Sequence, residues 1–176
     1  MSASTRHGEG PMTPEMLCCK RLVRSLVAAM ILAGALSPGG GVEATPPPGG
    51  LVCPVRGPVW YTNSWGAPRP DGRRHEGVDL MAPMGTPLVA VASGRVSFGF
   101  NRLGGRVAWV HADDGTRHYY AHLSRIAGFP RRVRAGDVIG YVGMTGNAGA
   151  PHLHWEVHPG GGAAVNPYPY AVRARC

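Results

Sequence analysis

Lysine, acidic residues and aromatic residues are scarce in this chain of 176 residues. Of the 18 basic residues only Lys20 is a lysine, and the 10 acidic residues leave a formal net charge of +8. Such a surplus attracts polyanions, including nucleic acid, anionic lipid and acidic cell-wall polymers. The aromatic residues, 7% of the chain, lack the regular spacing of a base-stacking platform. We therefore expect no specific nucleic-acid partner, and we regard anionic cell-wall polymers as candidate partners of the basic surface.

Long apolar runs are also absent. The run Leu26 to Leu36 has 11 residues, well short of the roughly 20 that a membrane-spanning helix needs. Three basic residues precede it, and small residues follow it up to Ala44, which is typical of a cleaved export signal. We predict a signal peptide within residues 1–44 and a mature protein without a permanent membrane span. Its expected location is the cell wall, the periplasm or the extracellular space.

Cysteine is rare as well, with four residues in the chain. Cleavage after Ala44 removes Cys18 and Cys19, and it leaves Cys53 and Cys176 near the two ends of the mature chain. In an exported protein such a pair favours a disulfide. We therefore predict a bond between Cys53 and Cys176.

Glycine and proline, by contrast, are abundant, and they separate short apolar runs as turn residues. Residues 45–50 form a proline- and glycine-rich linker, and residues 51–176 suffice for one domain. No helical pattern in that domain exceeds about two turns. Strands are predicted over Leu88 to Ala92, Arg95 to Phe100, Arg106 to Ala112, Thr116 to His122 and Val138 to Val142. Because Asp114-Gly115 favours a hairpin, we predict an all-β domain of mainly antiparallel sheets with few or no helices.

Two histidines one residue apart, His152 and His154, carry the first chemical signal. In a strand their side chains leave one face about 7 Å apart. Leu153, Trp155 and Val157 fall on the opposite face, where their apolar side chains indicate a core. The pair alone is also typical of a solvated strand face, so it needs partners elsewhere in the chain.

Candidate partners lie in two other segments. His75 and Asp79 stand in a glycine-rich stretch that is typical of a loop entering a strand. Zinc binds imidazole nitrogen and carboxylate oxygen, and catalytic zinc sites keep three protein ligands and a water. His75, Asp79 and one of His152 or His154 would complete such a set. His122, at the end of a predicted strand, is placed to face the same cavity, although a surface salt link and a hairpin-edge histidine are the simpler interpretations of these motifs.

Four segments occur together and in a fixed order. They are His75-x-Gly77-Val78-Asp79, Tyr120-Ala121-His122-Leu123-Ser124, Ala135 to Gly146, and Pro151-His152-Leu153-His154-Trp155-Glu156-Val157. In this combination the chain, from about Leu51 to Tyr170, closely resembles the lysostaphin/LytM-type zinc endopeptidases of peptidase family M23.

This resemblance implies a barrel-sandwich-like, lysostaphin-type peptidase domain over residues 51–176, with zinc as the cofactor. It implies that His75, Asp79 and His154 are the metal ligands. It also implies that His122 and His152 are the catalytic residues that assist a zinc-bound water. Which of these two histidines is the general base stays open.

The resulting hypothesis is an exported zinc metalloendopeptidase that hydrolyses peptide bonds in peptidoglycan cross-links or stem peptides. The alternative is a non-catalytic murein-binding or amidase-activating module of the same fold. Such modules usually lack some ligands, whereas all five positions are filled here. The bond that is cut stays open, because specificity is expected to lie in loops such as Asn63 to Arg74 and Phe100 to Gly105.

Several residues near the motifs need separate interpretation. Glu156 shares the strand face of His154, and we interpret it as a surface carboxylate, with orientation of an imidazole as the alternative. Some family members carry a tyrosine shortly before the first ligand histidine that helps to polarise the substrate. Here Arg73 or Arg74 is the candidate substitute in that role. Without motif support, three histidines are expected to be structural or solvent-facing: His111, His118 and His158.

Overall fold

The structure is a computed structural model that describes residues 50–176. The signal peptide predicted within residues 1–44, with Cys18 and Cys19, and linker residues 45–49 lie outside the described residues. Export and the domain boundaries therefore stay predictions. Within residues 50–176, no helix combines the length and the apolar character needed to cross a membrane.

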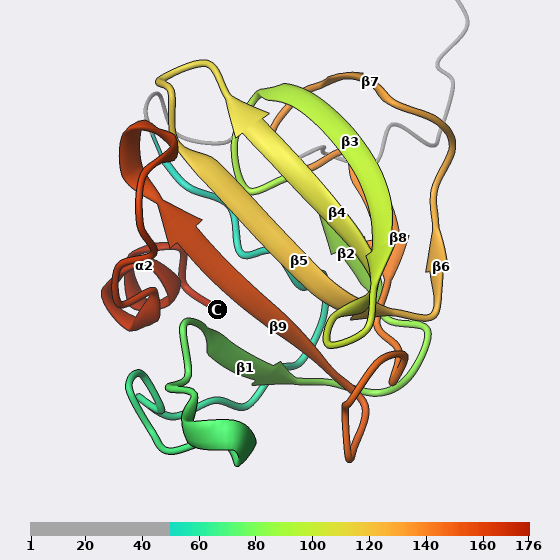
Figure 1. Ribbon diagram of the computed structural model, residues 1–176. Coiled ribbons are helices and arrows are strands. Elements are labelled where there is room, and N and C mark those ends of the chain that lie inside the picture. Colours follow the sequence, from blue (N-terminus) through green and yellow to red (C-terminus); the bar gives the residue numbers. More distant parts are fainter. Residues whose placement is uncertain (1–49) are drawn as a thin grey trace, which may run out of the picture. The chain divides into compact units, whose positions relative to one another are not determined.

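Antiparallel strands are the main regular structure of the described chain, and they form two sheets (Figure 1). The larger sheet has the order β1-β9-β5-β4-β3-β7, and the smaller has the order β2-β8-β6. The strands are β1 Val78–Met81, β2 Pro87–Val89, β3 Gly94–Asn101, β4 Gly105–Ala112, β5 Arg117–Leu123, β6 Arg125–Ile126, β7 Arg131–Val133, β8 Val138–Tyr141 and β9 His152–His158. Short helical segments are η2 Pro70–Gly72, η3 Pro159–Gly161 and α2 Tyr168–Arg173. The predicted all-β, antiparallel class is confirmed.

Alternation along β9 separates the core from an open face. Leu153, Trp155 and Val157 are fully buried, and they belong to one apolar cluster with Leu88 of β2 and Ile139 of β8. The core therefore includes residues of both sheets, as the apolar positions of β9 predicted. The histidines of β9 lie on the other face of the larger sheet, where they are only partly buried.

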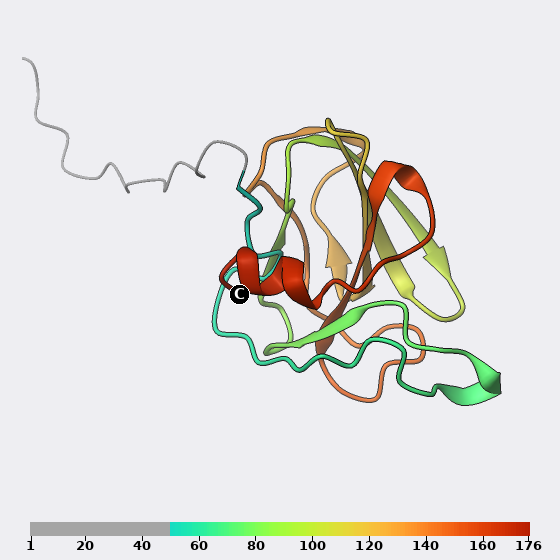
Figure 2. The same ribbon diagram turned by 90° about the vertical axis from the view of Figure 1, so that its left-hand side faces the viewer.

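The two ends of the described chain are joined by a disulfide between Cys53 and Cys176. Figure 2 shows the C-terminal helix α2 beside the first described residues. Both cysteines pack against the core, so the bond connects two segments that close the same end of the domain.

Replacement of both Cys53 and Cys176 by serine is expected to lower the free energy of unfolding substantially. The bond spans 123 residues, and the loop-entropy relation gives about 4 to 5 kcal/mol as an upper value for a loop of this length. Denaturant unfolding of the oxidised protein and of the double variant measures the difference. Equal unfolding midpoints would contradict the structural role of the bond.

A buried histidine in the core predicts a loss of stability in acid. His118 is 1% exposed, and its ring stacks on Trp155 with centroids 5.9 Å apart. Burial lowers the pKa of His118 from 6.5 to about 4, although Asp114 opposes the shift. The unfolded chain therefore binds a proton below pH 6.5 that the folded chain accepts only near pH 4.

The stabilising contribution of neutral His118 is thus complete above pH 6.5 and lost as the pH falls toward 4. Between about pH 7.5 and about pH 4 the loss amounts to about 3 kcal/mol. A His118→Phe variant keeps an aromatic ring at this position and removes the titrating group. Over the same pH range its free energy of unfolding should therefore fall by about 3 kcal/mol less than that of the unmodified protein. Identical pH dependence in both proteins would contradict the assignment.

Candidate active site

Strand register brings the candidate ligands Asp79 and His154 together. In the pairing of β1 with β9, Asp79 lies directly opposite His154, and His75 stands in the loop just before β1. Gly77 makes this approach possible, because a Cβ at Gly77 would lie 2.5 Å from Cε1 of His154. The glycine in the first motif therefore leaves room for the imidazole of the last.

Three candidate ligand atoms converge on one point. His75 Nε2 lies 3.0 Å from Asp79 Oδ1 and 3.0 Å from His154 Nδ1. His154 Nδ1 lies 2.9 Å from Asp79 Oδ1. These three side chains form the His/Asp cluster within residues 50–176 whose geometry suits a metal ion. Both histidines present one specific nitrogen to it.

The opposite nitrogen of each imidazole is engaged outside the cluster. His75 Nδ1 lies 3.0 Å from the carbonyl oxygen of Ser64, and His154 Nε2 lies 2.9 Å from Glu156 Oε1. Donation of an N–H to these acceptors leaves His75 Nε2 and His154 Nδ1 as the nitrogens that can bind a metal once it displaces their protons. These two nitrogens and a carboxylate oxygen thus face one another, an arrangement that fits a shared cation.

The pKa shifts agree with a site built for positive charge. Burial would raise the pKa of Asp79, but the hydrogen bonds from His154 and His75 hold it well below its ordinary value. Burial would lower the pKa of His154, but Asp79 and Glu156 raise it to about 9. Two imidazole nitrogens and one carboxylate oxygen are donors that zinc prefers, and three protein ligands leave a position for water. The residues present therefore fit zinc.

His122 reaches the same region through an irregularity in its strand. The pairing of β4 with β5 shifts register near the end of β5, and such a bulge redirects side chains. Ala121 lies opposite His154, so strict alternation would turn His122 into the core. Instead, His122 adopts a positive φ of 68°, and its ring lies beside the other histidines. Its ring centroid lies 4.7 Å from that of His152 and 6.0 Å from that of His154.

Backbone carbonyls hold the orientation of both remaining histidines. His122 Nδ1 lies 2.7 Å from the oxygen of Thr145, and His152 Nδ1 lies 2.8 Å from that of Ala150. Burial lowers the pKa of His122 to about 4, although the Thr145 carbonyl opposes the shift. The His122 imidazole is therefore neutral at pH 7. Within residues 50–176, Nε2 of each ring has no hydrogen-bonded backbone partner.

A single cavity of about 680 Å³ contains all five predicted site residues in its lining. Both loops in which specificity was expected also line it. The first loop contributes Arg69, Pro70, Arg73 and Arg74, and the second contributes Asn101, Leu103 and Gly104. The structure thus brings together the segments that the sequence motifs singled out.

Arg69 is a site residue that sequence reasoning missed. Its Nη2 atom donates to Asp79 Oδ2 at 2.6 Å, so the guanidinium fixes the oxygen that does not face the cluster. Arg73 and Arg74, the predicted substitutes for the family's substrate-polarising tyrosine, also line the cavity. The ion pair depends on the fold of the loop before His75, and no spacing in the sequence indicates it.

The interpretation of Glu156 as a surface carboxylate is wrong. Its side chain is only 13% exposed, and its two oxygens bind different histidines. Oε1 accepts from His154 and Oε2 lies 2.8 Å from Nε2 of His158, whose Nδ1 in turn lies 2.9 Å from the carbonyl of Gly162. Glu156 and His158 therefore orient His154, as the weighed alternative had it. His111 is exposed and His118 is buried in the core, as expected.

A Glu156→Gln variant is expected to bind zinc more weakly by about 10- to 100-fold, because outer carboxylates raise ligand basicity and fix ring orientation. Competition of the purified protein with a chromogenic chelator measures the affinity. Glu76→Gln is the matched control, since Glu76 is an exposed carboxylate on the rim of the same cavity. Equal zinc affinity in both variants would show that Glu156 does not support the ligand.

Comparison with known proteins decides the family. The model of peptidase family M23 matches residues 73–167, which include all five predicted metal-binding and catalytic residues. The chain belongs to peptidase family M23. The predicted resemblance is therefore confirmed.

Relatives of this M23 domain include two named peptidases. It is 41% identical over 101 residues to the DD-carboxypeptidase/endopeptidase Mpg of Neisseria meningitidis serogroup B, covering 57% of this chain and 23% of the relative. It is 35% identical over 136 residues to the L-Ala--D-Glu endopeptidase of Bacillus subtilis, covering 66% of this chain and 41% of the relative. The match thus covers less than half the length of either relative.

Solved structures support the lysostaphin-type fold. The catalytic domain of the antimicrobial peptidase lysostaphin from Staphylococcus simulans superposes with a TM-score of 0.57 at 33% identity. The match covers 65% of this chain and 92% of that domain. The part shared with lysostaphin is therefore nearly its whole catalytic domain.

Proposed function

We propose that this M23 domain is a zinc metalloendopeptidase that hydrolyses peptide bonds in the cross-links or stem peptides of peptidoglycan. The observation that carries the proposal is the convergence of His75 Nε2, Asp79 Oδ1 and His154 Nδ1 beside two further imidazoles in one cavity. The named activities of the Neisseria and Bacillus relatives support peptidoglycan as the substrate.

In this proposal His75, Asp79 and His154 hold the metal, and Arg69 and Glu156 orient two of these ligands from outside. When bound, zinc acts as a Lewis acid that polarises the peptide carbonyl and lowers the pKa of water. The chain supplies three ligands and therefore leaves room for water and substrate.

His122 and His152 serve the proton transfers. Each donates its Nδ1 proton to a backbone carbonyl and directs a free Nε2 to the cavity. A neutral imidazole accepts a proton from the attacking water and returns it to the leaving amine. The low pKa of His122 keeps this ring neutral before reaction, and the 4.7 Å between the two ring centroids supports a role for both at one substrate bond.

The predicted signal peptide supports an exported location for the enzyme. We propose that residues 1–44 direct export, that residues 45–50 are a linker, and that the domain over residues 51–176 acts in the cell wall, the periplasm or the extracellular space. The arginine-rich composition, with a net charge of +8, supports retention on an anionic wall.

Digestion of purified peptidoglycan tests the proposal. Soluble products are separated and their masses determined, and each cut is expected to create one new amino group and one new carboxylate at a peptide bond. The bond identified in this way also defines the specificity. Binding to peptidoglycan without any new termini would instead support the alternative, a non-catalytic murein-binding or amidase-activating module.

A further inference from the structure

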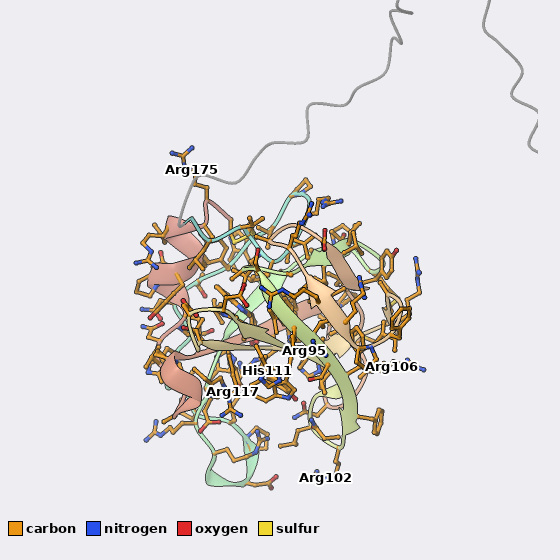
Figure 3. The ribbon with its side chains drawn as sticks, turned by 90° about the horizontal axis from the view of Figure 1, so that it is seen from above. Arg95, Arg102, Arg106, His111, Arg117 and Arg175 are labelled. Carbon is orange, nitrogen blue, oxygen red and sulfur yellow. A yellow bond between two sulfur atoms is a disulfide. The ribbon has the colours of Figure 1, made fainter. Side chains whose placement is uncertain are left out.

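Five basic side chains form a row across the open face of the larger sheet. They lie directly opposite one another on five adjacent strands, in the order Arg132, Arg95, His111, Arg117 and His158. Figure 3 shows Arg95, His111 and Arg117 next to one another, with Arg175 well apart from them. We call these five residues the basic row. Because residues two apart share a strand face, the row lies on the face that carries His154.

The three arginines of the row have little internal compensation. Like charges directly opposite on neighbouring strands are destabilising, yet Arg95 stands directly opposite Arg132. Within residues 50–176, Asp113 is the carboxylate that lies within 4.0 Å of a row arginine, 2.7 Å from Arg132, whereas the row member His158 is paired with Glu156 at 2.8 Å. Within residues 50–176, Arg69 and Arg132 are the arginines that have a carboxylate oxygen within 4.0 Å. The row therefore presents positive charge that an anion from outside would neutralise.

Two aromatic side chains lie between the row and the cavity. Trp109 and Tyr119 lie opposite each other, with ring centroids 4.7 Å apart, and both line the cavity. The Arg117 guanidinium lies 5.5 Å from the ring centroid of Trp109. One continuous surface thus runs from His154 over the two rings to the basic row.

The length of this surface suits a peptide. His158 follows His154 by four residues in β9, so this end of the row lies about 13 Å from the candidate metal ligand. Arg95 and Arg132 lie three and four strands away from β9, which places them about 20 and 23 Å from that ligand. An extended peptide covers about 3.3 to 3.6 Å per residue. A peptide with its scissile bond beside His154 therefore reaches the near end of the row after about four residues and the two far arginines after about six to seven.

We propose that the basic row binds free carboxylates of peptidoglycan peptides about four to seven residues from the bond that is cut. The inference rests on the proposed function and adds to it a binding subsite. Arginine pairs with carboxylates through two parallel hydrogen bonds, and peptidoglycan peptides carry carboxylates along and at the ends of their chains. Continuity of the row with the cavity favours the substrate itself over a separate phosphate-containing polymer.

The test compares an Arg95→Gln/Arg132→Gln variant with an Arg173→Gln/Arg175→Gln control, which removes two exposed charges in and after α2. Binding is measured by co-sedimentation with peptidoglycan sacculi stripped of phosphate polymers, over about 50 to 500 mM salt. We expect about tenfold weaker binding at low salt for the row variant, with a flatter salt dependence. The control should bind like the unmodified protein, and both double variants should keep its melting temperature.

Sacculi whose carboxylates have been converted to amides provide the second arm. The unmodified protein should bind them as weakly as the row variant binds untreated sacculi. Equal binding to both preparations, or a row variant that loses affinity only for a poly(glycerol phosphate), would overturn the inference. Because sedimentation needs no turnover, row-dependent binding by a protein that cuts no peptide would contradict the proposed function and still support the row.

Discussion

Replacement of Asp79 by asparagine is expected to abolish zinc binding and to reduce peptide hydrolysis by at least about 10⁴-fold, because without the metal the pKa of water returns from about 7 to about 16. Asp79 contacts both other candidate ligands, with Oδ1 at 3.0 Å from His75 and 2.9 Å from His154. An amide removes the charge that holds these two nitrogens and the ion together. The same loss is expected for His154→Ala.

Metal content and rate are measured together to test this prediction. Asp71→Asn is the matched control, because it makes the same change at an exposed aspartate in η2, and asparagine tolerates the positive φ of that position. The control should bind one zinc per chain and keep its rate. An Asp79→Asn protein that retains one tightly bound zinc and a normal rate would show that the cluster is not the metal site.

Alanine at His122 or His152 is expected to lower kcat by about 10² to 10⁴-fold, the range typical of lost general acid–base catalysis. Neither imidazole belongs to the three-atom cluster, since His152 Nε2 lies 3.6 Å from Asp79 Oδ1 and the His122 ring is turned by its own contact with Thr145. Zinc affinity should therefore stay near that of the unmodified protein. This separates the two histidines from the ligands.

The double variant sharpens this prediction. Residues that act on one proton path are strongly non-additive, so removal of both histidines should cost little more than the larger single effect. Single-turnover rates and zinc titrations of the three variants supply the measurement. Loss of zinc from His122→Ala or His152→Ala, or an unchanged kcat in either, would refute the catalytic assignment.

The strand pattern and the motifs were accessible from sequence for physical reasons that particular residues illustrate. Leu153, Trp155 and Val157 alternate with polar residues, so one face of β9 had to be the core. Asp114-Gly115 marked the hairpin between β4 and β5, and Gly115 adopts the expected positive φ of 84°. Both signals are local, because they depend on side-chain alternation and on one backbone conformation.

What depended on pairing between distant segments was not accessible. From spacing alone His152 and His154 were equivalent, and it is the register of β9 with β1 that sets His154 opposite Asp79. The bulge that directs His122 into the cavity leaves no trace in the apolar pattern. The ion pair of Arg69 with Asp79 also requires the fold of a loop.

The basic row illustrates the same limit at larger scale. Arg95, His111 and Arg117 are scattered along the sequence, and they become neighbours only because β3, β4 and β5 pair in one register. Composition indicated the excess of positive charge, whereas the structure gives part of that charge a position next to the cavity.

Titration of the metal-free protein with zinc, while the release of peptide from purified peptidoglycan is recorded, tests the central claim most directly. If His75, Asp79 and His154 hold one catalytic ion, hydrolysis rises in proportion to added zinc and stops rising at one ion per chain. Full activity in the metal-free protein, or saturation with zinc without any cleavage, would contradict the account.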